Sequence, residues 1–273
     1  MSHYKQPVTF FTYSLLLTWV TWFAAAYFSY QPDGDSTLMP LMILGTFWPF
    51  IVSLFLVIGS GNRTLKQDFW SRMVGRIGLA HAPAILLLLP ATLLLAIAIS
   101  VMFGGSVSQF GLSELFSSAG MAGLLISILA PTTEEIGWRG YGVDGLRSRF
   151  SLLKASLLFA LLWGLWHVPL FFINNNYQNE LWHAGLPYVA NFFISLVPLT
   201  VIMNWLYYRN GRSTLVAALF HIVAVVAAEA FLVEEWVKFI QTGILIVVAI
   251  GLVLYDKAYF LSDGVLTKDE KVA

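Results

Sequence analysis

Four side chains between residues 134 and 221 are of types that can activate water, and each lies in an apolar stretch. The segment from Pro131 to Arg139 contains the adjacent carboxylates Glu134 and Glu135, and His167 and His221 follow in separate hydrophobic runs. Placing Glu or His inside a membrane is costly, so such residues usually have a function there. We therefore take these residues as the candidate site.

The spacing within the first segment separates the two carboxylates into different roles. If the segment is helical, Glu135 and Arg139 stand one turn apart and can form an ion pair. Glu134 is then turned about 100° away from that pair. The spacing predicts a structural carboxylate at Glu135 and a carboxylate free to react at Glu134.

The depths of the candidate residues in the membrane also agree. Measured along ideal helices, Glu134 lies roughly 20 Å from Arg147, His167 roughly 20 Å from Lys154 and His221 roughly 14 Å from Arg212, and these basic residues mark the same membrane face. A carboxylate and two imidazoles at similar depth can meet in a helical bundle. Together they can hold and activate a water molecule for hydrolysis.

The same three side chains are an alternative zinc site, because two His and one Glu leave one coordination position open. The helical metalloprotease pattern His-Glu-x-x-His is absent from the sequence. We expect no cofactor, with zinc on Glu134, His167 and His221 as the alternative that spacing leaves open. The chain has no Cys, which excludes thiol nucleophiles and thiolate metal sites.

Structural explanations compete with catalysis at each position taken singly. A Glu-Glu pair near an Arg can be an interfacial ion pair, and one intramembrane His can be a hydrogen bond between helices. The matched depth of all three residues favours chemistry. Glu229 lies near the outer end of its run, so we interpret it as interfacial.

Composition predicts the elements that must position these residues. The chain has 273 residues, of which 58% are hydrophobic and 11% charged, and its mean hydropathy is +0.76. A bilayer core about 30 Å thick needs about 20 apolar residues per helix. We predict an all-α polytopic membrane protein with about eight transmembrane helices, at 8–29, 38–60, 82–103, 119–138, 155–173, 187–208, 213–232 and 236–255.

The loop charges predict how the chain is oriented. Cytoplasmic loops of membrane proteins carry an excess of Lys and Arg. With eight spans, every basic residue but Lys238 falls on the side of the termini, whereas the opposite loops carry acidic residues. We therefore expect both termini in the cytoplasm and a multi-pass location in a bacterial inner or plasma membrane.

The organisation of the chain follows from the same patterns. We expect a single membrane domain over 1–273, with the motifs within about 119–232 and a short cytoplasmic tail at 256–273. Apolar residues recur at helical spacing over 65–77, which is consistent with an in-plane interfacial helix or with a basic loop anchored by aromatic residues. The balance of 15 basic and 15 acidic residues argues against a nucleic-acid partner.

The motifs resemble those of the CAAX protease and bacteriocin-processing family of intramembrane endopeptidases, also called type II CAAX endopeptidases or the Abi family. Its Glu-Glu-x-x-x-Arg motif matches Glu134, Glu135 and Arg139, and its Phe-x-x-x-His motif matches His167 with Trp163 in place of Phe. The phrase from Trp163 to Phe171 is typical of bacterial members.

The resemblance assigns a role to each matched residue. It implies that Glu134 and His167 activate water, that Arg139 orients the glutamates, and that His221 stabilises the oxyanion. The family's third motif places Asn or Asp four residues after that histidine, but this chain has Val225 there. Its activity could therefore be reduced or absent. We name Asn204 as a substitute donor and Trp163 as a further candidate for contact with the substrate or the oxyanion.

The resemblance leads to a first hypothesis and an alternative. The first is a glutamate-dependent endopeptidase that admits a peptide or protein substrate from the cytoplasmic side while embedded in lipid. The alternative is a non-proteolytic scaffold or bacteriocin-immunity-type protein that keeps the fold. A transporter is a weaker third, since the sequence shows no repeat or pair of broken helices. The sequence predicts neither an oligomeric state nor whether the substrate is prenylated.

Overall fold

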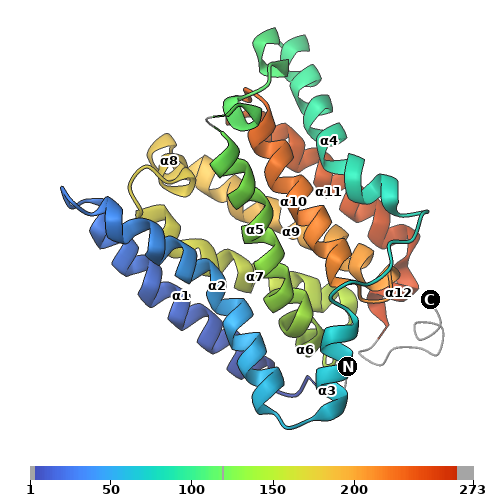
Figure 1. The fold of residues 1–273 in the computed structure, drawn as a ribbon. Helices are drawn as coiled ribbons and strands as arrows, with labels where there is room; N and C mark the ends of the chain where they lie inside the picture. Colours follow the sequence, from blue (N-terminus) through green and yellow to red (C-terminus); the bar gives the residue numbers. More distant parts are fainter. Residues whose placement is uncertain (1–3, 119, 263–273) are drawn as a thin grey trace.

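A computed structural model describes residues 4–118 and 120–262, and these form a bundle of helices (Figure 1). The only β pairing among them is an isolated bridge between Leu112 and Phe231. The all-α prediction is confirmed. In chain order the elements are α1 (Pro7–Ser29), α2 (Asp35–Gly59), α3 (Arg63–Ser71), α4 (Ala82–Met102), η1 (Val107–Phe110), η2 (Glu114–Phe116), α5 (Met121–Gly137), η3 (Trp138–Gly142), α6 (Val143–Arg147), α7 (Leu152–His167), η4 (Val168–Phe172), α8 (Tyr177–Ala184), α9 (Leu186–Arg209), α10 (Thr214–Ala230), α11 (Val237–Tyr255) and α12 (Lys257–Leu261).

Six helical segments are long and apolar enough to cross a membrane, so the predicted number of about eight is corrected to six among the described residues. They are Pro7–Ser29, Asp35–Gly59, Ala82–Met102, Leu152–Phe172, Leu186–Arg209 and Val237–Tyr255. The predicted spans 119–138 and 213–232 instead form α5 and α10, of 17 residues each. These two shorter helices pack within the bundle and contact each other. Helix α5 carries the two glutamates and α10 carries His221. The two helices that bear the site are therefore the ones that are shorter than a membrane-spanning helix.

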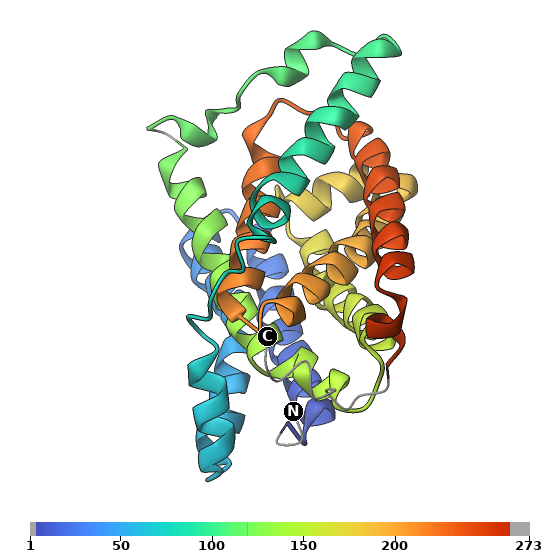
Figure 2. The same cartoon turned by 90° about the vertical axis from the view of Figure 1, so that its right-hand side faces the viewer.

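One end of the bundle collects the described chain termini together with α3, α6 and α12 (Figures 1 and 2). Hydrogen bonds join these elements, such as Tyr4 to Asp68 at 2.7 Å and Arg147 Nη2 to the Ser262 hydroxyl at 3.2 Å. We call this the terminal end. Part of the predicted tail thus forms the helix α12, whose Phe260 is buried.

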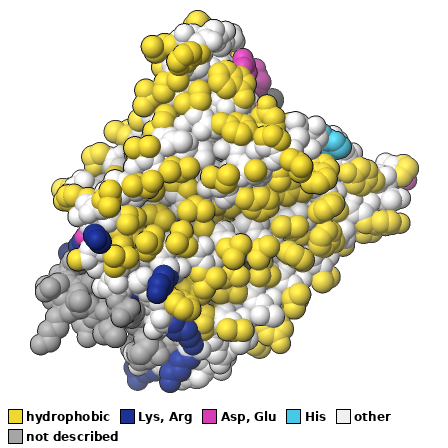
Figure 3. All heavy atoms as spheres, turned by 180° about the vertical axis from the view of Figure 1, so that it is seen from behind, with side chains coloured by type: hydrophobic (Ala, Val, Ile, Leu, Met, Phe, Trp, Pro, Cys, Tyr) yellow, Lys and Arg dark blue, Asp and Glu magenta, His cyan; other side chains and the backbone are white. Residues whose placement is uncertain are grey.

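The opposite end of the bundle, which we call the distal end, is formed by α8 and the connecting segments 103–118 and 231–236 (Figure 2). The amide of Ser113 donates to the carbonyl of Ala230, and the amide of Leu232 donates to the carbonyl of Gly111. Between the two ends the surface is mainly hydrophobic, and the Lys and Arg on the face in Figure 3 gather at the terminal end. This is the pattern of a protein that spans a membrane.

The segment 65–77 begins as a helix and then leaves helical geometry. Asn62 caps α3 by accepting a hydrogen bond from the amide of Leu65 at 3.1 Å, and α3 buries Leu65 and Phe69. The helix ends at Ser71, so it covers only part of the predicted stretch. Both interpretations of the segment are partly met, by a short amphipathic helix followed by an irregular basic loop.

Local signals start and place the helices that carry the site. Ser151 caps α7 and Ser213 caps α10, each by accepting a bond from a backbone amide in the first turn. Gly137 ends α5 where a Cβ would come within 2.5 Å of the backbone of Pro49. Only glycine permits this approach of α5 to α2, which fixes the start of η3 against its neighbour.

Candidate active site

The first motif lies where α5 turns into η3, a single π-helical turn, and the structure contains the ion pair predicted from its spacing. Arg139 Nη1 lies 2.8 Å from both carboxylate oxygens of Glu135, and both side chains are fully buried. A π-helical turn within a helix often marks a functional site. Glu134 turns to another neighbour, because its Oε2 accepts a bond of 3.4 Å from the indole nitrogen of Trp163.

His221 approaches the same motif from α10. Its Nδ1 lies 2.9 Å from Glu135 Oε1, so Glu135 holds both Arg139 and His221. Because a carboxylate only accepts hydrogen bonds, Nδ1 carries the proton in this contact. For the other ring nitrogen, Nε2, to donate a hydrogen bond as well, the imidazole must carry a proton on both nitrogens.

His167 ends α7 and is oriented by its own helix. Its Nδ1 lies 2.7 Å from the carbonyl oxygen of Trp163, so this nitrogen is the donor and Nε2 is left as an acceptor. The ring of Trp163 contacts both histidines, with centroids 5.4 Å from His167 and 5.2 Å from His221. Trp163 therefore brings Glu134, His167 and His221 together around one indole.

Asn204 lies behind Arg139 and has partners that do not suit an oxyanion donor. Its Oδ1 accepts from Arg139 Nε at 3.2 Å, and its Nδ2 donates to Ser156 at 3.0 Å. Asn204 is fully buried and does not line the cavity that contains the two histidines. The geometry favours a positioning role for Asn204 through Arg139.

Replacing Asn204 with alanine tests that role. The substitution leaves Arg139 Nε without its partner in a buried site, and an unsatisfied buried donor costs about 1 to 3 kcal/mol or more when charged. We expect Asn204→Ala to lower the melting temperature and to reduce cleavage in parallel. Asn204→Asp, which keeps an acceptor for Arg139, should retain more activity. Full activity and stability in Asn204→Ala would contradict the assignment.

A buried ionic cluster at the terminal end holds the motif from behind. Arg72 donates to the carbonyl of Gly140 at 3.0 Å, and the Tyr207 hydroxyl donates to the carbonyl of Arg139 at 2.8 Å. Asp144 balances the cationic charge, since Arg72 Nη1 lies 3.0 Å away and Arg212 also contacts its carboxylate. The cluster thus anchors the backbone of η3 that carries Arg139.

Asp144 makes the stability of the fold depend on pH. Burial alone would raise the pKa of Asp144, but the charges of Arg212 and Arg72 outweigh it and hold the pKa below its usual value. The unfolded chain therefore binds more protons, and the stabilisation is complete above about pH 4 and lost as pH falls further. We expect the melting temperature of the purified protein to drop below pH 4.

A matched variant isolates this contribution. Asp144→Asn breaks a buried ion pair, which typically costs about 3 to 5 kcal/mol. It should melt at a lower temperature at pH 7, and its melting temperature should change less between pH 7 and pH 3 than that of the unaltered protein. Equal pH slopes in the two proteins would rule out the role of Asp144.

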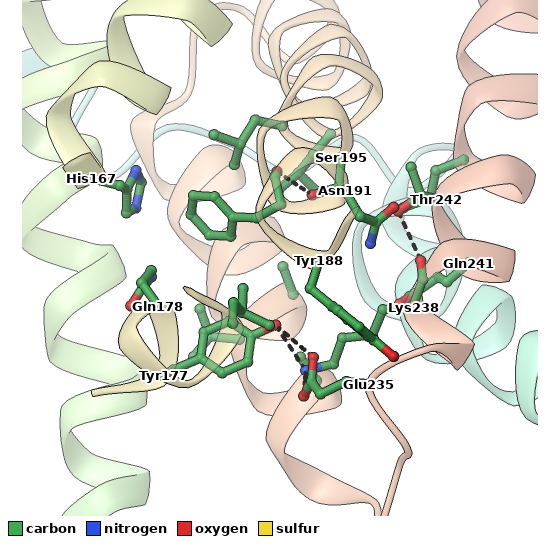
Figure 4. A pocket seen from close by; sticks show the side chains of 18 of the residues that line it. His167, Tyr177, Gln178, Tyr188, Asn191, Ser195, Glu235, Lys238, Gln241 and Thr242 are labelled. Atoms are coloured by element: carbon green, nitrogen blue, oxygen red, sulfur yellow. Dashed lines mark hydrogen bonds and ion pairs between the residues drawn. The ribbon is translucent and has the colours of Figure 1, made fainter. Parts of the chain in front are cut away.

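The two histidines and Trp163 line a cavity of about 520 Å³. Val225 lies in the same wall, one helical turn after His221 on α10. The cavity extends from the histidines toward α8 and the start of α11 at the distal end, where Tyr177, Glu235 and Lys238 bond to one another (Figure 4). A peptide admitted through this cavity would meet the histidines at its inner end.

The zinc alternative is not matched by the side-chain geometry. Within 4–118 and 120–262, no three His, Cys, Asp or Glu side chains are grouped as metal ligands. His221 is turned to Glu135 through Nδ1, and Glu134 to Trp163. We therefore assign no reaction step to a metal.

Glu229, interpreted from the sequence as interfacial, is a wall residue of this cavity. Its Oε2 accepts a hydrogen bond of 2.7 Å from Ser127 on α5. Glu229 follows His221 by eight residues on α10, so helical spacing puts the two side chains on nearly the same face of the helix. This spacing could have indicated from the sequence that Glu229 lies in the same cavity. The polar residues contributed by α8 and α9, such as Gln178 and Asn191, carried no comparable signal.

The fold and these contacts define a multi-pass integral membrane protein with Glu and His side chains gathered inside a helical bundle. Comparison with known proteins gives the family. Residues 116–227 match the family described as type II CAAX prenyl endopeptidase Rce1-like. The chain is also 40% identical over 265 residues to CAAX prenyl protease 2 of the archaeon Methanococcus maripaludis, which covers 95% of this chain and 98% of that relative.

This protein belongs to the type II CAAX prenyl endopeptidase family, and the resemblance seen in the motifs is confirmed. The family is one of intramembrane endopeptidases, with peptide or protein substrates and a location in the membrane. The relative is archaeal, so the location in a bacterial membrane stays a prediction. The assignment of residues 1–273 to a single membrane domain also stays a prediction.

Proposed function

We propose that this protein hydrolyses a peptide bond with a water molecule activated by Glu134 and His167, and that His221 contacts the oxyanion. The observation that carries the proposal is the meeting of all three side chains at Trp163, two of them on the wall of a cavity large enough to hold a peptide segment. The membership of the chain in an endopeptidase family supports it.

The reaction divides into an addition and an elimination. Glu134 removes a proton from the water while His167 Nε2 accepts a hydrogen bond from it, and the water oxygen bonds to the scissile carbonyl carbon. His221 Nε2–H donates to the resulting oxyanion. Glu134 then gives its proton to the leaving nitrogen as the C–N bond breaks, which returns a carboxylate and releases an amine and an acid.

Glu135 and Arg139 act on this reaction without touching the substrate. Glu135 fixes the orientation of His221 by accepting a hydrogen bond from its Nδ1. Arg139 fixes Glu135 and is itself held by Asn204. The reaction needs no cofactor, and we expect a chelator such as EDTA to leave the rate unchanged.

The name of the curated relative suggests the first substrate to test, a prenylated peptide with a C-terminal CAAX sequence. Purified protein in lipid would be incubated with this peptide and with its unprenylated form in water enriched in oxygen-18. We expect a product peptide whose new carboxyl group contains the label, and no product from Glu134→Ala. Equal cleavage by both proteins would refute the role of Glu134.

Val225 favours a second function, a membrane scaffold or immunity-type partner that binds without cleaving. The side chain lies in the cavity wall where the family motif has Asn or Asp, and it cannot donate a hydrogen bond. Complementation separates the two functions. A deletion phenotype that Glu134→Ala restores supports binding, and one that it fails to restore supports catalysis.

A further inference from the structure

We propose that the indole N–H of Trp163 positions the carboxylate of Glu134 for catalysis, which makes Trp163 a positioning residue of the site. What Glu134 does to the water rests on the proposed function, whereas the hydrogen bond that holds Glu134 rests on the structure alone. The motifs had suggested that Trp163 contacts the substrate or the oxyanion. Its contacts assign the N–H to the general base instead.

Glu134 lies inside the bundle, where the described residues give its carboxylate one hydrogen bond. The residue is 7% exposed, and its Oε2 accepts from Trp163 Nε1 at 3.4 Å. The charged and polar donors nearby are used by the next residue, because Arg139 and His221 both bond to Glu135. Burying a carboxylate is costly unless it is hydrogen-bonded. The indole of Trp163 is therefore the contact that stabilises Glu134 in place.

A second indole, that of Trp138, lies near Glu134 but does not take over this role. Trp138 follows Glu134 by four residues, and its indole also acts on the carboxylate. Within the described part of the chain, however, the buried N–H of Trp138 has no hydrogen-bond partner. Trp163 is thus the donor that reaches Glu134. Because this bond occupies Oε2, the other oxygen, Oε1, is left to accept a proton from water.

The ring of Trp163 is packed on several sides, which fixes the direction of its N–H. The residue is 2% exposed, and its ring stacks on Phe159 with centroids 5.9 Å apart and planes 18° apart. The rings of His167 and His221 meet it edge-on. Phe159 is held in turn by the guanidinium of Arg139, which lies 4.6 Å from the centroid of the phenyl ring. A donor fixed in this way needs no reorganisation when the reaction begins.

The N–H of Trp163 is a group that the phenylalanine of the family motif lacks. A phenyl ring can make similar contacts with Phe159 and the two histidines, but it has no hydrogen-bond donor, whereas the indole has one. This chain therefore holds its general base through a donor that depends on Trp at this position. The substitution Trp163→Phe isolates that donor, because it removes the N–H and keeps an aromatic ring.

We expect Trp163→Phe to lower kcat on the prenylated CAAX peptide by about tenfold, the effect of one hydrogen bond to a charged group, with KM nearly unchanged. Trp22→Phe is the matched control, because Trp22 is also 2% exposed, its N–H donates to the carbonyl of Met42 at 3.1 Å, and it does not line the cavity. This control should keep the kcat of the unaltered protein. In the Glu134→Gln background, Trp163→Phe should cost nothing further, since the donor acts through the missing base.

Three kinetic results would overturn the proposal. The first is an unchanged kcat in Trp163→Phe, and the second is a rise in KM alone, which would place Trp163 against the substrate. The third is a multiplicative loss in the double variant, which would mean that Trp163 acts independently of Glu134.

Nuclear magnetic resonance tests the hydrogen bond without catalysis. In protein labelled with nitrogen-15 at its ten Trp, each indole N–H gives one signal, and Trp163→Phe removes that of Trp163. We expect this signal to move in Glu134→Gln, since a neutral amide accepts less strongly than a carboxylate, and to stay in place in Glu180→Gln. A signal that stays in place in both variants of an active enzyme would refute this inference alone. A signal that moves in a protein that cleaves no peptide would refute the proposed function and leave the hydrogen bond.

Discussion

Glu134→Gln is expected to lower kcat by about 10² to 10⁴, the range that general acid-base groups contribute. Glutamine keeps the shape of the side chain and an oxygen that can accept from Trp163, so the buried contact is preserved while the basic group is lost. KM should change little. The control is Glu180→Gln, since Glu180 lies on the exposed surface of α8 and does not line the cavity.

A double mutant shows whether Glu134 acts on the same water as His167. Residues that act as a unit in catalysis have strongly non-additive effects. His167→Ala alone should cost about as much as Glu134→Gln, and the combined variant should be hardly slower than either. Kinetics on a fluorogenic form of the cleaved peptide would measure all four proteins. Multiplicative losses would mean that the two residues act in separate steps.

The sequence alone predicted the residues of the site better than their contacts. The pairing of Glu135 with Arg139 followed from helical spacing, which a short π-helical turn did not disturb. The link from Glu135 to His221 joins residues 86 positions apart. No local pattern encodes such a contact, which depends on how α5 packs against α10.

Trp163 shows a second limit of sequence analysis. It was a candidate substrate or oxyanion residue at the position where the family motif has phenylalanine, but its contacts with Glu134 and both histidines were not predicted. The chain has ten Trp, a residue that is common at membrane interfaces. Nothing in the sequence distinguishes the one indole at the centre of the site from the others. Its role depends on tertiary packing.

The predicted number of about eight transmembrane helices was wrong for a physical reason. Hydropathy measures how apolar a stretch is, whereas the ends of α5 and α10 are set by η3 and by the bridge at Phe231. The predicted runs therefore extended beyond both helices. The sequence analysis did not predict the ionic cluster either. In the sequence, Arg72 and Arg212 look like basic residues of cytoplasmic loops, and only the folded structure shows that they pack against Asp144.

Val225→Asn is expected to raise kcat by as much as about 10² to 10³, the effect of one oxyanion donor. Val225 stands one turn after His221, so both side chains project on the same helix face into the same cavity. Asparagine has a helix propensity similar to that of valine, which limits the cost to α10. The added amide can donate beside His221 Nε2.

Val225→Leu is the matched control, because leucine has nearly the shape of asparagine without its donor. We expect Val225→Leu to stay at the rate of the unaltered protein or below, and His221→Ala to remove most of the gain from Val225→Asn, since both donors act on one oxygen. Equal rates for the Asn and Leu variants would mean that this position does not face the oxyanion. If neither the unaltered protein nor Val225→Asn cleaves any peptide, the position has no catalytic deficit to repair, and binding without cleavage becomes the function that the cavity supports.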